Sequence, residues 1–413
     1  MEYKIKKLKK NQENRGLDRL SSLPDSILAH ILSFLDTRSA IKTSILSKRY
    51  KLLWTLSPCL DFSFSEYQTY RFESCDGRAF SIVKKSSLDS FKSYVDRVLQ
   101  LRERSDLIKF RLSLHNDVGS ELIDNCISYA ARHKVQHFRL RGLVKENPFP
   151  LPKLLLNSMS LISLHLHNAT RNSIDLPKSV YLPNLMLLRL KNFEFCDSNF
   201  NGEVFLGCPK LETLVLCKCS IRPVNGLKVL DVSCLNLKNL EIRCWRSPWK
   251  CFDKHTINVR APKLFSFLFK GHLARVNFQG GLPFVEEACI DLSFPTACFM
   301  VNVSERKRRT LEGFLCMLRQ IRNIKFLSLS LKTLEVMAAP PGLQGHAPVF
   351  LSNLRLVKFT ARNRYMEENN LLPESSKVKK DTRNIALPAH VLHFLLESSP
   401  SLKLFGVEIP KES

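Results

Sequence analysis

Two close pairs of side chains in this 413-residue sequence are of types that bind metal ions: Cys217 with Cys219, and His165 with His167. Alternate residues of a strand point to the same face, so each pair could present two ligands together. A structural zinc site needs four ligands, and neither pair has a second pair at a useful spacing. We therefore expect no metal site and no cofactor, and interpret the 13 cysteines as reduced, mostly buried thiols.

Sequence motifs that carry catalysis are missing from the chain. It contains no G-x-x-x-x-G-K-[ST] phosphate loop, no G-x-G-x-x-G, no G-x-S-x-G and no H-E-x-x-H. Its acidic residues show no compact pairing of the kind that glycosidases use. The sequence therefore predicts a binding protein and not an enzyme.

Cationic side chains recur within a repeated frame, apolar-x-x-apolar-x-apolar. Full copies begin at residues 107, 135, 161, 185, 211, 227, 237, 264 and 285, and weaker copies begin at 324, 354 and 402. If each copy forms a strand, the residue between its last two apolar positions and the residue after the last point away from the core. In the first four copies these outward positions include Arg111, Arg139, Arg141, His165, His167, Arg189 and Lys191, and later copies place Val215 and Cys217 there.

These basic positions suggest a binding strip. Guanidinium groups suit paired oxygen acceptors, so we expect the strip to hold an acidic or phosphorylated segment of a target protein. The alternative is an ordinary solvated sheet face in a chain whose net charge is +25.

The spacing of the frame indicates how the strip is built. The first five copies start 28, 26, 24 and 26 residues apart, within or near the range of leucine-rich repeats. Pro183, Pro209, Pro262 and Pro400 each lie two residues before a copy, where proline commits the chain to extended geometry. Short parallel strands then stack into a curved solenoid with the sheet on its concave face. The step from 227 to 237 is too short for a full repeat, and the steps before 324 and 402 imply insertions.

Residues 18–60 show a different pattern, that of short helices. Pro24 and Asp25 suit a first helical turn. One apolar helical face follows, made of Ile27, Leu28, Ile31, Leu32 and Leu35. Asp36 can cap a second helix and Ser47 a third. Three short helices make a marginal domain, so we expect part of the apolar surface to be buried against a partner.

This segment resembles the F-box, in its plant form. The carrying residues are Asp18-Arg19-Leu20, Leu23-Pro24-Asp25, Ile31-Leu32-Ser33-Phe34-Leu35, Thr43-Ser44, Leu46-Ser47-Lys48-Arg49 and Leu53-Trp54. Tyr50 stands where the family usually has tryptophan. The resemblance implies binding to a Skp-type adaptor, which in turn binds a cullin scaffold. It implies that adaptor contact and internal packing are divided among Leu20, Leu23, Pro24, Ile27, Leu28, Ile31, Leu32, Leu46, Leu53 and Trp54.

A run of basic residues within the same segment fits steering toward an acidic adaptor, or else a solvated helical face. The run comprises Arg38, Lys42, Lys48, Arg49 and Lys51.

The patterns together predict an α/β chain, in which a short three-helix F-box precedes an irregular leucine-rich-repeat solenoid. We expect a basic disordered tail at 1–17, the F-box at 18–60, a helical connector at 61–105, repeats at 106–345, and further repeats at 346–413. The last segment resembles part of the FBD module found in many plant F-box proteins with leucine-rich repeats.

The resemblance implies a non-catalytic substrate receptor of an SCF (Skp–cullin–F-box) ubiquitin ligase. The alternative is a repeat scaffold that engages the adaptor without promoting ubiquitination. Binding to nucleic acid is suggested by the charge alone, without a recognised signature. No apolar run is long enough to span a membrane and no signal peptide is visible, so we expect a protein of the nucleus, the cytoplasm or both. Basic clusters at 4–10 and 306–309 suit either nuclear import signals or solvated surface.

Overall fold

The structure, a computed structural model, describes most of the chain in segments. These are residues 20, 22–64, 74–75, 78–79, 85–102, 105–117, 120–143, 153–168, 180–196, 205–222, 229–245, 256–271, 275–292, 303–338, 343, 346, 348–360, 388–402 and 404–408. The predicted tail at 1–17 lies outside them. The chain divides into two compact units, residues 1–143 and residues 144–413. The first unit therefore includes the beginning of the segment that the sequence predicts as repeats.

The first unit begins with the helices of the segment that resembles the F-box, which is called the F-box segment, or F-box for short. Helix α2 spans Asp25–Leu32 and α3 spans Thr37–Lys42. The carboxylate of Asp36 caps α3, because its Oδ1 accepts a hydrogen bond from Ser39 N at 2.8 Å, as predicted.

The residues predicted for the third helix, Tyr50, Leu53 and Trp54, lie in two short 3₁₀ turns and not in one continuous helix. Three short 3₁₀ turns follow α3: η1 (Thr43–Ile45), η2 (Arg49–Lys51) and η3 (Leu53–Leu56). Leu52, with φ −118° and ψ −2°, separates η2 from η3 and prevents a continuous helix. The predicted capping role of Ser47 is also wrong, since η2 starts after Lys48 and has no side-chain cap.

A parallel sheet of three strands completes the first unit, in the order β1 (Cys59–Ser63), β4 (Lys109–Asp117) and β5 (His137–Leu143). The buried rings of Phe62, Phe110 and Phe138 pack in a row beneath it, with centroids 5.8 and 5.7 Å apart. Two helices belong to this unit, α4 (Lys85–Leu101) and α5 (Ser120–Arg132), together with the short antiparallel pair β2 (Ser74–Cys75) and β3 (Arg78–Ala79). Helix α4 confirms the amphipathic helix predicted for the connector.

Two side chains join the F-box to this sheet. Thr37 Oγ1 on α3 accepts a hydrogen bond from Asp61 N on β1 at 2.7 Å. The buried guanidinium of Arg102 donates from Nε to Ser57 O at 3.1 Å and from Nη1 to Ser105 O at 3.0 Å. Because these bonds connect the end of the F-box to β1 and to the start of β4, the F-box and the first strands form one structural body.

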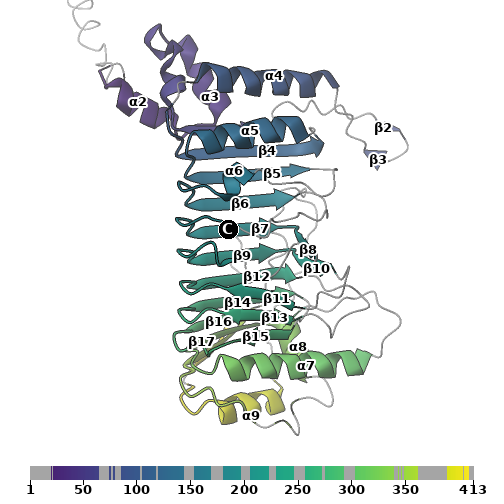
Figure 1. The fold of residues 1–413 in the computed structure, drawn as a ribbon. Helices are drawn as coiled ribbons and strands as arrows, with labels where there is room; N and C mark the ends of the chain where they lie inside the picture. The colour runs from purple at the N-terminus through teal and green to yellow at the C-terminus, as the bar shows by residue number, and fades with distance from the viewer. Residues whose placement is uncertain are drawn as a thin grey trace, which may run out of the picture. The chain divides into compact units, whose positions relative to one another are not determined.

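The second unit is a stack of parallel strands, seen as successive arrows in Figure 1. Adjacent strands pair so that the apolar frame positions align, for example Leu164 with Leu188 and Leu214 with Leu240. In order they are β6 (Ser163–Asn168), β7 (Leu187–Lys191), β9 (Thr213–Cys217), β12 (Asn239–Trp245), β14 (Ser266–Gly271), β16 (Glu287–Leu292), β17 (Phe326–Ser330), β18 (Leu356–Thr360) and β19 (Leu404–Glu408).

The frame copy at 227 forms β11 (Val229–Ser233), which lies in a second, three-stranded sheet with β13 (Thr256–Arg260) and β15 (Arg275–Phe278). The step of 10 residues to the next copy therefore separates strands of different sheets. Strands β8 (Glu194–Cys196) and β10 (Ser220–Arg222) pair in parallel and form a separate two-stranded sheet. The remaining helices are α6 (Lys153–Leu156), α7 (Val303–Gln320), α8 (Leu331–Ala338) and α9 (Ala389–Ser398).

A four-residue turn precedes the strands of the main sheet. Leu185 N donates to Leu182 O at 3.1 Å, and the same bond recurs from Leu211 N to Cys208 O at 3.0 Å. Pro183 and Pro209 occupy the second position of these turns, which the fixed φ of proline suits. The prediction that these prolines impose extended geometry is therefore wrong, since they form the turn just before the strand.

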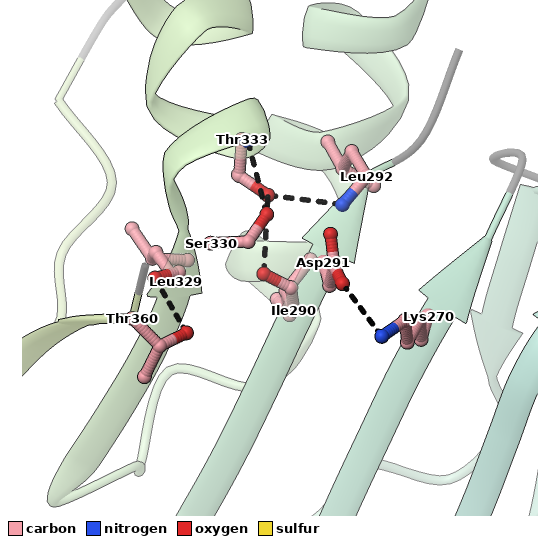
Figure 2. A network of polar contacts seen from close by, with 8 residues as sticks. All are labelled: Lys270, Ile290, Asp291, Leu292, Leu329, Ser330, Thr333 and Thr360. Carbon is pink, nitrogen blue, oxygen red and sulfur yellow. Dashed lines mark hydrogen bonds and ion pairs between the residues drawn. The ribbon is translucent and has the colours of Figure 1, made fainter. Parts of the chain in front are cut away.

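The side chain of Thr333 provides hydrogen bonds to β16 at the point where β16 and β17 stop pairing. The pairing of β16 with β17 ends at Ile290 and Leu329, and the chain then turns into α8. The Thr333 hydroxyl replaces the missing strand, accepting from Leu292 N at 2.9 Å and donating to Ile290 O at 3.1 Å (Figure 2). Ser330 Oγ accepts from Thr333 N at 3.2 Å and thereby caps α8.

Candidate functional site

The F-box helices expose many large apolar side chains. Phe34 is 78% exposed although its ring meets that of His30 edge to face, and Ile45 is 88% exposed. We call the whole set the apolar F-box surface, and its members are Leu20, Ile27, Ile31, Phe34, Leu35, Ile45, Leu46, Leu52 and Leu56.

The structure separates the residues predicted for adaptor contact. Leu20, Ile27, Ile31 and Leu46 belong to the apolar F-box surface, and Pro24 is also exposed. Leu23 is half-buried. The core takes the other four, namely Leu28, Leu32, Leu53 and Trp54. Packing of α2 against η3 buries these four side chains.

Sequence reasoning left Phe34, Leu35, Ile45, Leu52 and Leu56 out of the contact set. A helical signal for two of them was present, because Ile27, Ile31, Phe34 and Leu35 follow at i, i+4, i+7 and i+8. This stripe is distinct from that of Leu28 and Leu32, which faces the core. The small core of this segment buries only one of the two apolar stripes, so the other stripe stays exposed.

The side chain of Arg49, in η2, bonds to residues at the start of α2. Its Nε donates to Asp25 Oδ1 at 2.7 Å, and its Nη2 donates to the backbone oxygen of Leu23. Asp25 begins α2, so this clamp fixes the backbone on either side of Pro24. Of the five basic residues predicted to steer an adaptor, Arg49 is thus committed to an internal ion pair, while Lys42, Lys48 and Lys51 are exposed.

The structure distributes the predicted basic strip over both units. In the first unit, Arg111 aligns with Arg139, and Ser113 with Arg141. Arg139 and Arg141 are exposed. Arg111 instead binds the carboxylate of Asp61 on β1, with Nη1 and Oδ2 3.1 Å apart. On the same face, burial and the nearby Lys109 lower the pKa of His137, which favours its neutral form.

In the second unit, His165 aligns with Arg189, and His167 with Lys191. Of these four residues Arg189 is exposed, whereas the other three are half-buried. The structure therefore brings them together on two neighbouring strands.

Beyond β7 the outward face of the second unit changes character. Val215 and Cys217 lie in register with the outward positions of the neighbouring strands, as predicted, but both are buried. Val215 lies in register between Arg189 and Glu241, whose longer side chains flank it. Further along, charges pair within the chain. Arg243 meets Glu241 at 2.8 Å, and Lys270 meets Asp291 at 3.3 Å (Figure 2).

The described residues contain no group of three or more His, Cys, Asp or Glu side chains that could hold a metal ion. Their cysteines are free thiols, and burial raises the pKa of Cys208 and of Cys234 to about 12, so both stay protonated. Within the same described segments, no helix is both long enough and apolar enough to cross a membrane.

Two parts of the chain match known protein families. Residues 20–61 match the F-box domain. Residues 123–279 match a family described as FBD-associated F-box protein At5g56370, LRR repeats. The chain belongs to the F-box/leucine-rich-repeat family.

Relatives of this F-box/LRR chain occur in Arabidopsis thaliana. It is 30% identical to F-box/LRR-repeat protein At3g59200 over 333 residues, which covers 78% of this chain and 60% of that protein. It is 28% identical to putative F-box/LRR-repeat protein At4g15060, over 74% of this chain and 71% of the relative. It is also 28% identical to F-box/FBD/LRR-repeat protein At5g22660, over 77% of this chain and 66% of the relative. The F-box/LRR chain thus spans about 60% of the length of the first relative.

The F-box match ends at residue 61, which lies inside β1. In this F-box/LRR protein the last F-box residues are therefore the first residues of the sheet. The alternation of Leu60, Phe62 and Phe64, all buried, is the signal that could have predicted this strand.

Proposed function

We propose that this F-box/LRR protein is the substrate receptor of an SCF ubiquitin ligase. The observation that carries the proposal is the apolar F-box surface, on a domain that belongs to the family of adaptor-binding domains. Burial of apolar area contributes about 25 cal/mol per Å², so nine such side chains supply enough driving force for a stable interface. Exposed Lys42, Lys48 and Lys51 complement an acidic Skp-type adaptor, and the adaptor would bind the cullin scaffold.

The target protein would bind the outward face of the parallel strands. In this proposal Arg139, Arg141, His165, His167, Arg189 and Lys191 contact an acidic or phosphorylated target. Arg111 contributes less than the sequence suggests, because Asp61 already neutralises it. The chain itself supplies proximity and orientation, while other subunits transfer ubiquitin. We place this function in the nucleus, the cytoplasm or both, where free thiols such as those of the described cysteines persist.

The test is co-purification of the intact chain with a plant Skp-type adaptor, compared with the double variant Leu23→Ala/Pro24→Ala. We expect capture by the intact chain and loss of capture by the variant. A folded intact chain that captures no adaptor would contradict the proposal. Ubiquitination of a captured target in the reconstituted ligase then distinguishes the receptor from a scaffold that only engages the adaptor.

The Arg49 clamp provides a second prediction. We expect Arg49→Ala to weaken adaptor capture about tenfold, because a charge-assisted bond contributes about 1.5 to 3 kcal/mol and here holds the backbone beside Pro24. Titration of the adaptor by calorimetry measures the change in Kd. Arg97→Ala is the control, since it removes an exposed arginine from α4 of the same unit, outside the F-box. Equal Kd values for the two variants would show that the clamp has no role in positioning the contact.

A further inference from the structure

Three phenylalanines are exposed where successive strands of the second unit begin, at the ends from which the arrows of Figure 1 start. Phe265 lies just before β14, Phe284 lies in the turn before β16, and Phe326 is the first residue of β17. Backbone hydrogen bonds make these strand starts neighbours, because Glu286 N donates to Phe265 O at 2.9 Å and Lys325 N donates to Glu286 O at 2.8 Å. We call the three side chains the phenylalanine edge.

The core of the second unit does not use these rings. The first residues of the same three copies of the frame, Leu264, Val285 and Ile324, are buried and fill the core beneath the turns. The phenylalanines are 41% to 62% exposed. Exposed apolar side chains that occur singly are common, but neighbouring ones mark a contact surface. The edge is therefore apolar area that is available to a partner.

The charges beside the phenylalanine edge are unevenly compensated. Glu286 pairs with Lys325, and Glu287 is exposed at the start of β16. On the other side of β17, Arg322 lies in the turn before the strand, and Arg355 N donates to Lys325 O at 2.9 Å. Both arginines are exposed, and neither has a carboxylate partner in the part of the chain that the structure describes. An acidic group of a partner would complement them.

The spacing of the strands favours a helical partner. Neighbouring strands lie about 4.8 Å apart, so side chains at their starts recur at about that distance. A helix that lies across the strand starts brings an apolar residue to the same side once per turn, about every 5.4 Å. An extended segment repeats on one side only about every 6.6 to 7 Å. Across three strands the helix departs from the strand spacing by about 1 Å and the extended segment by about 4 Å.

We propose that the phenylalanine edge docks an amphipathic α-helix of another protein, with one apolar face and acidic residues beside it. The apolar face covers the three rings, and the acidic residues meet Arg322 and Arg355. A nucleic acid carries phosphates along its whole length, so Glu286 and Glu287 oppose it, whereas a helix can place its acidic residues on the arginine side alone. This surface is distinct from the basic positions on β6 and β7, and its occupation does not depend on adaptor binding.

The experiment measures peptide binding by the full chain in the absence of an adaptor. The probe is a fluorescent helix-forming peptide of about 18 residues, with Leu at i, i+3, i+4 and i+7 and Glu beside that face. A matched peptide of the same composition and charge has its Leu residues distributed around the helix. We expect the amphipathic peptide to bind about tenfold more tightly by fluorescence anisotropy. Equal affinities would overturn docking of a helix face.

Matched variants assign the binding to the phenylalanine edge. We expect Phe284→Ser to weaken binding of the amphipathic peptide about tenfold and Phe34→Ser, the same change at an exposed phenylalanine of the F-box, to leave it unchanged. We expect Arg322→Ala to weaken it several-fold, with Arg260→Ala, at an exposed position of β13 in the same unit, as the control. All four residues are exposed, so urea unfolding should show unchanged stability. Equal losses within either pair would reduce the effect to general apolar or charge attraction and overturn the proposal.

A nucleic acid and the adaptor provide the remaining comparisons. Competition by single-stranded oligouridine that is also weakened by Phe284→Ser would overturn the choice of a protein partner. Retained adaptor capture together with unchanged peptide binding by Phe284→Ser would overturn this inference alone. Peptide binding that depends on Phe284, in a chain that captures no adaptor, would overturn the receptor proposal alone.

Discussion

Trp54→Ala is expected to unfold the first unit, whereas Ile31→Asp is expected to leave it folded and to abolish adaptor capture. Trp54 is 6% exposed and packs in the small core between α2 and η3. Truncating a buried tryptophan costs about 3 to 5 kcal/mol, which approaches the whole stability of a small unit. Ile31 is 40% exposed on the other apolar stripe, so a carboxylate there stays solvated in the free protein.

The effect of Ile31→Asp is confined to the complex. An interface that buries this position must desolvate the new carboxylate, at a cost of several kcal/mol. Urea unfolding followed by circular dichroism measures stability, and adaptor co-purification measures capture. Ser93→Asp, at an exposed position of α4 outside the F-box, is the control for added charge. Full capture by a folded Ile31→Asp variant would remove α2 from the adaptor contact.

The strands of both units could largely be predicted from the sequence because one local pattern encodes them. The frame specifies three inward apolar residues, and the copies at 107, 161 and 264 each lead into a strand of a parallel sheet. Strand β1 escaped the frame for a specific reason. Its first frame position is occupied by Ser57, a buried serine whose hydroxyl bonds to the backbone of Cys59. A buried polar residue that makes its hydrogen bonds to nearby backbone is not detected by a search for a hydrophobic pattern.

The sites depended on contacts between residues far apart in the sequence, and these could not be predicted. Arg111 and Asp61 are separated by 50 positions, and Arg49 and Asp25 by 24. In the sequence all four are simply charged residues. Only the register of β1 against β4 and the return of η2 toward α2 show that Arg111 and Arg49 are paired internally. The burial of Val215 could not be predicted for the same reason, because it depends on side chains of neighbouring strands.

Thr333→Val is expected to destabilise the second unit by about 2 to 3 kcal/mol, although the two side chains have nearly the same shape. Thr333 is 0% exposed, and its hydroxyl bonds to the backbone of both Leu292 and Ile290 at the end of β16 (Figure 2). Valine removes the acceptor of Leu292 N–H and the donor to Ile290 O. Both backbone groups then remain buried without these partners, since β17 has already turned into α8.

Thr333→Ser is the matched control, because it keeps the hydroxyl and deletes only a methyl group, at a cost of about 1 kcal/mol. Hydrogen exchange at the Leu292 amide is expected to accelerate strongly in the valine variant and only slightly in the serine variant. Urea titration should rank their stabilities in the same order. If the valine variant were as stable as the wild type, the end of β16 would not depend on the hydroxyl. If serine were instead the worse substitution, packing of the methyl group, and not hydrogen bonding, would join α8 to the sheet.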